Sequence, residues 1–170
     1  TYFYRVRAQN FAGEFTAYDT EQSTYTKAAV PGSNVFVSVT TGSITINWPD
    51  TNSAGTKYFV EASTGNNASY GIIFAGNRPA ALTHNGLSAN TTYFYRARAQ
   101  NFDGEYTAYN TEITTYTKPA LLGAITVNSV STNSIQISWA DTNPAGTVYS
   151  VESSTGTNTA YGEIYSGNYP

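Results

Sequence analysis

The stretch "TYFYRARAQ" at Thr92–Gln100 alternates between two kinds of position. One set holds Tyr93, Tyr95, Ala97 and Ala99, and the other holds Phe94, Arg96 and Arg98. Successive side chains of a β-strand point to opposite faces. This period of two therefore predicts a strand with one face in a core and the other in solvent.

The stretches that precede it follow the same rule. "SITINW" at Ser43–Trp48 and "KYFVEAS" at Lys57–Ser63 also alternate, and turn-forming stretches such as "TTGS", "STGNN" and "NFDGE" separate the strands. Short alternating strands are typical of antiparallel sheets that bury one face. The sequence predicts an all-β fold, a sandwich of two sheets.

The same stretch occurs again at the start of the chain, as "TYFYRVRAQ". When residues 1–79 are placed on residues 92–170 without a gap, 49 of the 79 positions are identical. The repeating unit is then 91 residues long, because 92 − 1 = 91. This length exceeds that of solenoid repeats and suits a small independent domain in an array.

The composition excludes several classes of function. The 170 residues are 40% hydrophobic and 11% charged with a net charge of -3, so there is no basic surface for nucleic acid. No apolar run approaches the roughly 18 residues of a membrane span. The chain has no Cys and no Met, even at its first position, and we expect it to be a piece of a longer product.

Four stretches together resemble a bacterial fibronectin type III domain: "ITINW", "YFVEAS", "LTHNGLSANTTYFYRARAQN" and "TEITTYTKP". This family has an immunoglobulin-like β-sandwich of seven strands, lettered A, B, C, C′, E, F and G. The most specific part is "GLSANTTY", which resembles the family's tyrosine corner, with Leu87 and Tyr93 around the turn into strand F. The family usually has Pro where Ala89 stands. By this resemblance the structural core contains Trp48, Trp139, Leu87, Tyr93 and Tyr2.

The repeat divides the chain into three parts. Residues 1–27 resemble strands F and G of one domain, residues 28–118 a complete domain, and residues 119–170 strands A to C′ of a further domain. Each terminal part would leave one sheet face uncovered. We therefore expect head-to-tail completion, residues 119–170 of one unit meeting residues 1–27 of the next, and we favour a window of a longer repetitive chain over a swapped oligomer.

The sequence shows no pattern of catalytic or cofactor-binding residues. "GxSxG", "HExxH" and the phosphate-binding glycine patterns do not occur, and the one histidine, His84, is expected to face solvent on a strand. The loop "DTN" at Asp50–Asn52, repeated at Asp141–Asn143, favours turn formation over calcium binding, because it has few oxygen ligands. We predict no enzyme activity, no cofactor and no metal.

Aromatic residues outside the inward-facing set form a candidate contact surface. If Tyr58 and Tyr95 point into the core, Phe59 and Phe94 point out of it. The full set is Phe59, Phe94, Phe102, Tyr106 and Tyr109, with Phe11, Phe15 and Tyr18 in the first part. These side chains either contact neighbouring chains or glycans, or pack locally against their own sandwich.

Two functions fit these observations. The first is a structural spacer, stalk or filament body of a bacterial extracellular or cell-surface protein, whose partners are neighbouring copies or adjacent repeats. The alternative is a carbohydrate-binding or accessory module of a secreted carbohydrate-active enzyme, with glycans as partners.

Overall fold

A computed structural model describes residues 1–156 and 158–168. Within these residues the regular secondary structure is β-strand, and no helix has the length and apolar character of a membrane span. The strands in chain order are β1 (Tyr2–Tyr4), β2 (Gln22–Thr24), β3 (Val35–Val39), β4 (Ser43–Asn47), β5 (Lys57–Thr64), β6 (Gly71–Asn77), β7 (Leu82–Asn85), β8 (Thr92–Gln100), β9 (Ile113–Tyr116), β10 (Thr126–Val130), β11 (Ile135–Ser138), β12 (Val148–Ser153) and β13 (Gly162–Asn168).

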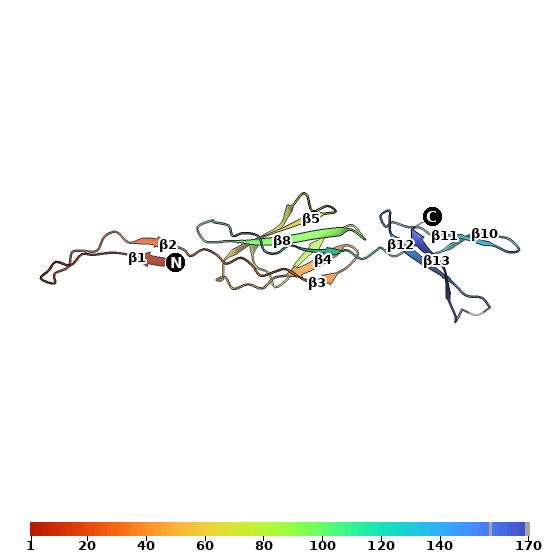
Figure 1. Cartoon of the computed structure of the whole chain (residues 1–170), viewed down its shortest axis with the longest axis horizontal. Helices are drawn as coiled ribbons and strands as arrows, with labels where there is room; N and C mark the ends of the chain where they lie inside the picture. Colours follow the sequence, from red (N-terminus) through yellow and green to blue (C-terminus); the bar gives the residue numbers. More distant parts are fainter. Residues whose placement is uncertain (157, 169–170) are drawn as a thin grey trace.

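The centre of the molecule is a sandwich of two antiparallel sheets (Figure 1). One sheet has the order β3-β4-β7 and the other the order β6-β5-β8-β9. The longest pairing joins β5 to β8, from Lys57 opposite Gln100 to Thr64 opposite Tyr93. The predicted all-β, immunoglobulin-like β-sandwich is confirmed.

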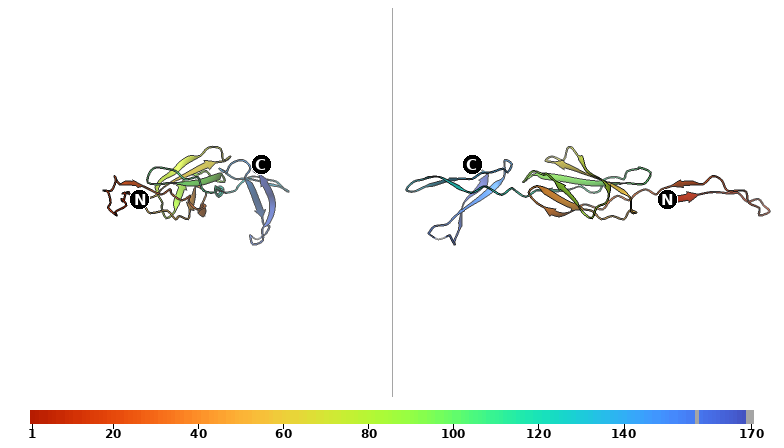
Figure 2. Two further views of the ribbon diagram at one scale, coloured as in Figure 1. Left: turned by 60° about the vertical axis from the view of Figure 1, so that its left-hand side comes forward. Right: turned by 180° about the vertical axis from the view of Figure 1, so that it is seen from behind.

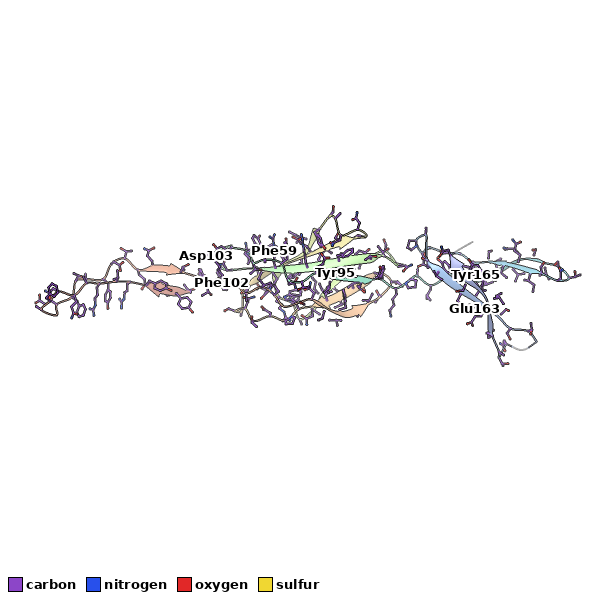
Figure 3. All side chains as sticks on the ribbon, in the orientation of Figure 1. Phe59, Tyr95, Phe102, Asp103, Glu163 and Tyr165 are labelled. Atoms are coloured by element: carbon purple, nitrogen blue, oxygen red, sulfur yellow. The ribbon has the colours of Figure 1, made fainter. Side chains whose placement is uncertain are left out.

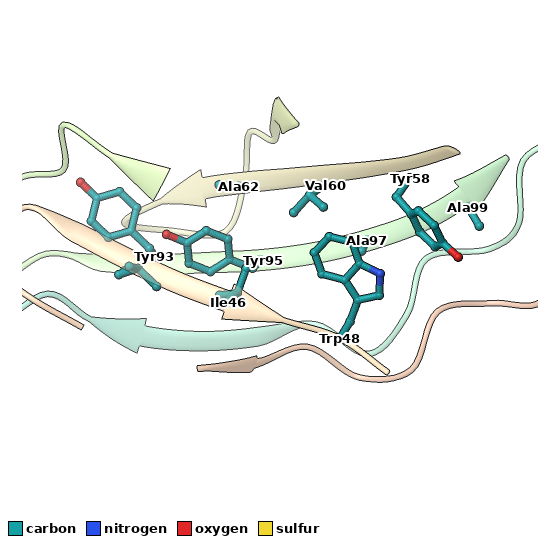
Figure 4. Packing of buried hydrophobic residues seen from close by; sticks show 10 residues of the cluster. Ile46, Trp48, Tyr58, Val60, Ala62, Tyr93, Tyr95, Ala97 and Ala99 are labelled. Atoms are coloured by element: carbon teal, nitrogen blue, oxygen red, sulfur yellow. The ribbon is translucent and has the colours of Figure 1, made fainter. Parts of the chain in front are cut away.

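Alternate residues of the long strands meet between the two sheets. In β8 the residues buried in this way are Tyr93, Tyr95, Ala97 and Ala99. Figure 4 shows the rings of Tyr93, Tyr95, Trp48 and Tyr58 in one layer between the strands. The Trp48 and Tyr58 ring centroids lie 5.7 Å apart. This layer is the core that holds the sheets together.

The turn into β8 has the predicted tyrosine-corner contacts. The Tyr93 hydroxyl accepts a hydrogen bond from the Ser88 amide at 2.9 Å, and Leu87 is half-buried against the core cluster. Asn90 takes a left-handed backbone conformation, with φ of 44°. The Thr117 hydroxyl accepts a hydrogen bond from the Thr91 amide at 3.0 Å. The turn is thereby tied to the end of the domain.

Two smaller assemblies flank the sandwich at opposite ends (Figures 1 and 2). On the N-terminal side β1 and β2 form a hairpin. On the C-terminal side the pairs β10-β11 and β12-β13 form half a sandwich around Trp139, Tyr149 and Val151. The repeat extends to local irregularities, since the register shift between Val60 and Glu61 recurs 91 residues later between Val151 and Glu152.

Two expectations are wrong for this chain. Tyr2, predicted as a core residue, is exposed, because no second sheet covers the hairpin. His84, expected to face solvent, is half-buried, and its Nδ1 lies 3.1 Å from the Tyr95 hydroxyl. Burial lowers the pKa of His84. On the paired strand β4, His84 lies opposite the buried Ile44. The His84 ring therefore lies on the inner face of the sheet, beside Tyr93 and Tyr95.

Candidate functional site

The outer face of the four-stranded sheet carries many of the predicted contact residues. Arg96 and Arg98 reach this face from β8, and Phe59 and Glu61 reach it from β5. Residues 101–112 run beside β8, held by backbone hydrogen bonds to its carbonyls, and place two tyrosines over the same face. We call the set Phe59, Glu61, Tyr70, Arg96, Arg98, Tyr106 and Tyr109 the arginine–aromatic face.

An ion pair lies at the centre of the arginine–aromatic face. The Arg96 guanidinium donates to the Glu61 carboxylate at 2.7 and 2.9 Å, and the Tyr109 hydroxyl donates to the other carboxylate oxygen at 2.6 Å. Burial raises the pKa of Glu61, but the hydrogen bonds from Tyr109 and Arg96 and the charges of Arg96 and Arg98 outweigh it. The pKa of Glu61 is therefore lowered, and the carboxylate stays ionised at neutral pH.

The arginines stack on the aromatic rings. Arg96 lies 3.8 Å from the centroid of Tyr70 and 4.0 Å from that of Tyr109. Arg98 lies 4.0 Å from the centroid of Tyr106, whose ring meets Phe59 edge-on at 5.0 Å. Each such cation–π contact contributes about 0.5–1 kcal/mol at an exposed site. The predicted residues Phe59, Tyr106 and Tyr109 thus pack within their own domain.

The remaining predicted residue of the loop, Phe102, belongs to a joint between the hairpin and the sandwich. Its ring lies 5.3 Å from the ring of Tyr25, and the Tyr25 amide and Thr24 hydroxyl donate to the Asp103 carboxylate at 3.4 and 3.5 Å. Figure 3 shows Phe102 and Asp103 at the end of the sandwich that faces the hairpin. A Cβ at Gly55 would meet the Phe102 ring at 3.3 Å, so the ring lies directly on that turn.

The "DTN" loops hold the two linkers in the same way. The Asn52 side chain accepts from the Ala29 amide at 2.7 Å and donates to the Ala29 carbonyl at 3.0 Å. The Asn143 side chain makes the same two bonds to Ala120, at 2.6 and 3.2 Å. In each loop the aspartate accepts from the asparagine amide two residues later, so it orients the loop itself.

A second kind of contact crosses the C-terminal joint. The Asn90 side chain donates to the Thr147 hydroxyl at 2.8 Å. Asn90 lies in the turn before β8, and Thr147 lies in the turn before β12. The left-handed conformation of Asn90, which few residues adopt without strain, aims this side chain across the joint.

The other predicted residues fall into three environments. Phe94 is half-buried on β8. Phe15 and Tyr18 stack under arginines of the hairpin, with Arg7 3.8 Å from the Phe15 centroid and Arg5 4.0 Å from that of Tyr18. Phe11, at the hairpin tip, is fully exposed.

Sequence reasoning missed the residues of the joints. Tyr25, Asn52, Asp103 and Asn90 make the contacts across and along the linkers. The repeated "DTN" is the available signal, but its local pattern indicates only a turn. The linker partners lie 23 residues away in sequence, so their contact is not visible in the local pattern.

Two further features of the described residues concern metal and ligand binding. No group of three or more His, Cys, Asp or Glu side chains lies close enough together in residues 1–156 and 158–168 to hold a metal ion. A cleft of about 450 Å3 beside the first linker is lined by Lys27, Ala28, Val30, Asn101, Glu105, Tyr106, Thr107 and Ala108. Of the predicted aromatic residues, Tyr106 alone lines it.

Comparison with known proteins shows the fold. No protein-family model matches the chain, and no curated protein matches it. Among solved structures, domains A168–A170 of titin match with a TM-score of 0.50 and 20% identity, over 68% of this chain and 40% of that one. A fibronectin type III domain of human fibronectin type III domain containing protein 3 matches over 58% of this chain and 93% of its own length, with a TM-score of 0.49 and 18% identity. The sixth such domain of that protein matches over the same shares, with a TM-score of 0.48 and 22% identity. The chain has an immunoglobulin-like β-sandwich fold.

Proposed function

We propose that this chain is a non-enzymatic structural segment of tandem fibronectin type III-like domains, acting as a spacer, stalk or filament body outside a bacterial cell. The observation that carries the proposal is the linker clamp, defined as the pair of hydrogen bonds from Asn52 to Ala29 and from Asn143 to Ala120. Two clamps of the same design, 91 residues apart, hold each linker against the domain that follows it. A spacer needs joints of this kind, because a free linker cannot keep domains in line.

The contacts across the joints support the same function. Tyr25 packs on Phe102 at the first joint, and Asn90 bonds Thr147 at the second. The rings of the arginine–aromatic face are occupied by their own arginines, which favours a structural role for them. The resemblance of the sequence to bacterial fibronectin type III domains supports the extracellular placement.

Backbone relaxation measured by NMR tests the linker clamp. We expect the amides of Ala29 and Ala120 to have order parameters near those of rigid backbone, about 0.85, and to fall towards 0.6 in the Asn52→Ala and Asn143→Ala variants respectively. Asn77→Ala, an exposed change on β6, is the matched control and should alter neither linker. Mobile linkers in the unsubstituted chain would contradict the spacer function.

The second candidate is glycan binding, and the cleft at Tyr106 is the observation that favours it. It predicts that the chain is retained on an insoluble polysaccharide and that Tyr106→Ala abolishes the retention. The spacer function predicts no retention of either form. Retention that depends on Tyr106 would replace the first proposal with the second.

A further inference from the structure

His84 lies on an edge strand of the central sandwich. It belongs to β7, which is paired with β4 alone, since the order of this sheet is β3-β4-β7. The strand has four residues, and one side-chain hydrogen bond of 3.0 Å, between Thr83 and Thr45, adds to the backbone pairing with β4. Short edge strands open at a lower free energy than strands inside a sheet. The attachment of β7 is therefore sensitive to a change in one inward-facing side chain.

The His84 ring connects β7 to the core. Its Nδ1 lies 3.1 Å from the Tyr95 hydroxyl, and its ring meets the rings of Tyr93 and Tyr95 edge-on, with centroid distances of 6.1 and 5.9 Å. Tyr95 is 0% exposed, and among the described residues its hydroxyl has no hydrogen-bond partner other than His84. The buried hydroxyl therefore depends on the histidine.

The direction of this hydrogen bond depends on the charge of His84. A neutral imidazole with its proton on Nε2 accepts a hydrogen bond from the Tyr95 hydroxyl at Nδ1. An imidazolium carries a proton on both ring nitrogens and can only donate. The hydroxyl then has to accept, and its own proton is left without an acceptor in the core. Because a buried donor without a partner is costly, protonation of His84 weakens the contact between β7 and β8.

The strands around His84 carry no carboxylate that could compensate its charge. The strands β3 and β4 have no ionisable side chain, and β7 has none besides His84. The titratable groups that face the ring are Tyr93 and Tyr95 of β8, which carry no negative charge near neutral pH. Arg96 and Glu61 belong to the arginine–aromatic face, on the other side of the four-stranded sheet. Burial accordingly lowers the pKa of His84 below its ordinary value of 6.5.

We propose that β7 is an acid-sensitive edge strand, which protonation of His84 releases from the central sandwich. In the closed state the neutral ring accepts the hydrogen bond of Tyr95, and in the open state the ring reaches water, which solvates its charged form. Release uncovers the Tyr95 ring and the edge of β4, while the sheet β6-β5-β8-β9 keeps its pairing. This device lies within the central sandwich and does not depend on the spacer function.

The pH range of the release follows from the direction of the pKa shift. Because the pKa of His84 is below 6.5 in the closed state, the closed strand binds fewer protons than the open one. The stability of the closed state is therefore complete above pH 6.5 and decreases as the pH falls, until the pH reaches the lowered pKa. His84 is the one histidine of the chain, and carboxylates titrate at lower pH, so this range is specific to it.

Native-state hydrogen exchange on the 170-residue chain tests the proposal. We compare protection factors, which correct for the intrinsic effect of pH on exchange. Between about pH 7 and pH 5 we expect those of the β7 amides to fall, by up to roughly tenfold for each pH unit that separates the pKa values of the open and closed states. Those of the β5-β8 pairing should not change.

Two variants separate the charge of His84 from other causes. His84→Gln keeps an acceptor for the Tyr95 hydroxyl at every pH, so the protection of β7 should no longer depend on pH. Thr83→Val, on the exposed side of the same strand, is the matched control. It removes the hydrogen bond to Thr45 and should lower the protection of β7 by the same factor at both pH values.

An NMR titration of the His84 ring in the unsubstituted chain is a second measurement and needs no variant. We expect its midpoint below 6.5. A midpoint at or above this value would overturn the proposal, because protonation would then hold β7 closed. Protection factors of β7 that do not change with pH, that fall together with those of β5-β8, or that fall equally in His84→Gln would overturn it as well.

Discussion

Glu61 accepts hydrogen bonds from two side chains on the outer face of the four-stranded sheet. It is buried, and it accepts hydrogen bonds from Arg96 and Tyr109, which lie on two different segments of the chain. A buried carboxylate is stable only when its charge is compensated in this way. The acid sensitivity of the domain should therefore depend on this side chain.

Glu61→Gln tests this dependence. Because the pKa of Glu61 is lowered in the folded state, its contribution to stability is present above the unfolded pKa and is lost as pH falls through the folded pKa. We expect the variant to have a lower free energy of unfolding than the unsubstituted chain at pH 7, and the difference to shrink below the ordinary glutamate pKa of 4.5. Urea unfolding at a series of pH values measures this. Glu105→Gln, at an exposed position, should show no such convergence, and a constant difference for Glu61→Gln would contradict the prediction.

Trp48→Ala tests the core at the same scale. The Trp48 ring is buried against Tyr58, and truncation leaves a cavity that the two sheets cannot close. We expect a loss of about 3–5 kcal/mol in the free energy of unfolding, a large part of the stability of a small domain. Val37→Ala, on the exposed side of β3, serves as the control for chemical denaturation. Equal losses from both changes would show that the core is placed wrongly.

At the scale of the element, the segment between β8 and β9 extends the sheet with side chains in place of regular strand pairing. The Thr107 side chain accepts a hydrogen bond from the Ala99 amide of β8 at 3.0 Å, and the Asn110 side chain accepts one from the Ala97 amide at 2.7 Å. The backbone amides of Thr107 and Asn110 in turn donate to the carbonyls of Ala99 and Ala97. Asn110 also donates to the Gly32 carbonyl at 2.8 Å. The segment is thereby tied both to β8 and to Gly32, in the stretch that precedes β3.

Asn110→Ala should loosen this edge. The change leaves the Ala97 amide and the Gly32 carbonyl without their side-chain partner, at a cost of about 1–3 kcal/mol for each buried group left unsatisfied. We expect faster hydrogen exchange at the Ala97 amide, with the amides of the β5-β6 pairing unchanged. Unaltered exchange at Ala97 would show that water replaces the side chain without cost.

At the scale of the whole molecule, stability is distributed unevenly along an elongated chain. The central sandwich has a closed core, the C-terminal part has a half-core around Trp139, and the hairpin has none. A two-stranded hairpin is at best marginally stable in water by itself. Among the described parts, the hairpin therefore has the least packing to hold its strands together.

Hydrogen exchange across the whole chain checks this distribution. In dilute solution we expect the amides of β1 and β2 to exchange fastest, those of β12 and β13 at intermediate rates, and those of β5 and β8 slowest. We expect this order of exchange rates because β5 and β8 lie over a closed core, β12 and β13 over a half-core, and β1 and β2 over none. Hairpin amides as protected as those of β8 at the lowest concentration would contradict it.

Alternation in Thr92–Gln100 and in the strands before it was enough to predict the sheets and the inward face, and the resemblance of "GLSANTTY" to a known family predicted the tyrosine corner. These features depend on local periodicity and on residues close together in sequence, such as Ser88 and Tyr93. The outward direction of Phe59 followed from the same period.

Only the tertiary structure decided what the outward residues and the loops do. Three kinds of contact join segments between which the alternating pattern shows no relation. They are the stacking of Arg98 on Tyr106, the half-buried position of His84 beside Tyr95, and the linker clamp of Asn52 on Ala29. Alternation of side chains along a strand shows which face of the strand each side chain occupies. It carries no information about which segment covers that face. That choice depends on the path of the loops and on the order of the strands in the sheet, both of which arise when the whole domain packs.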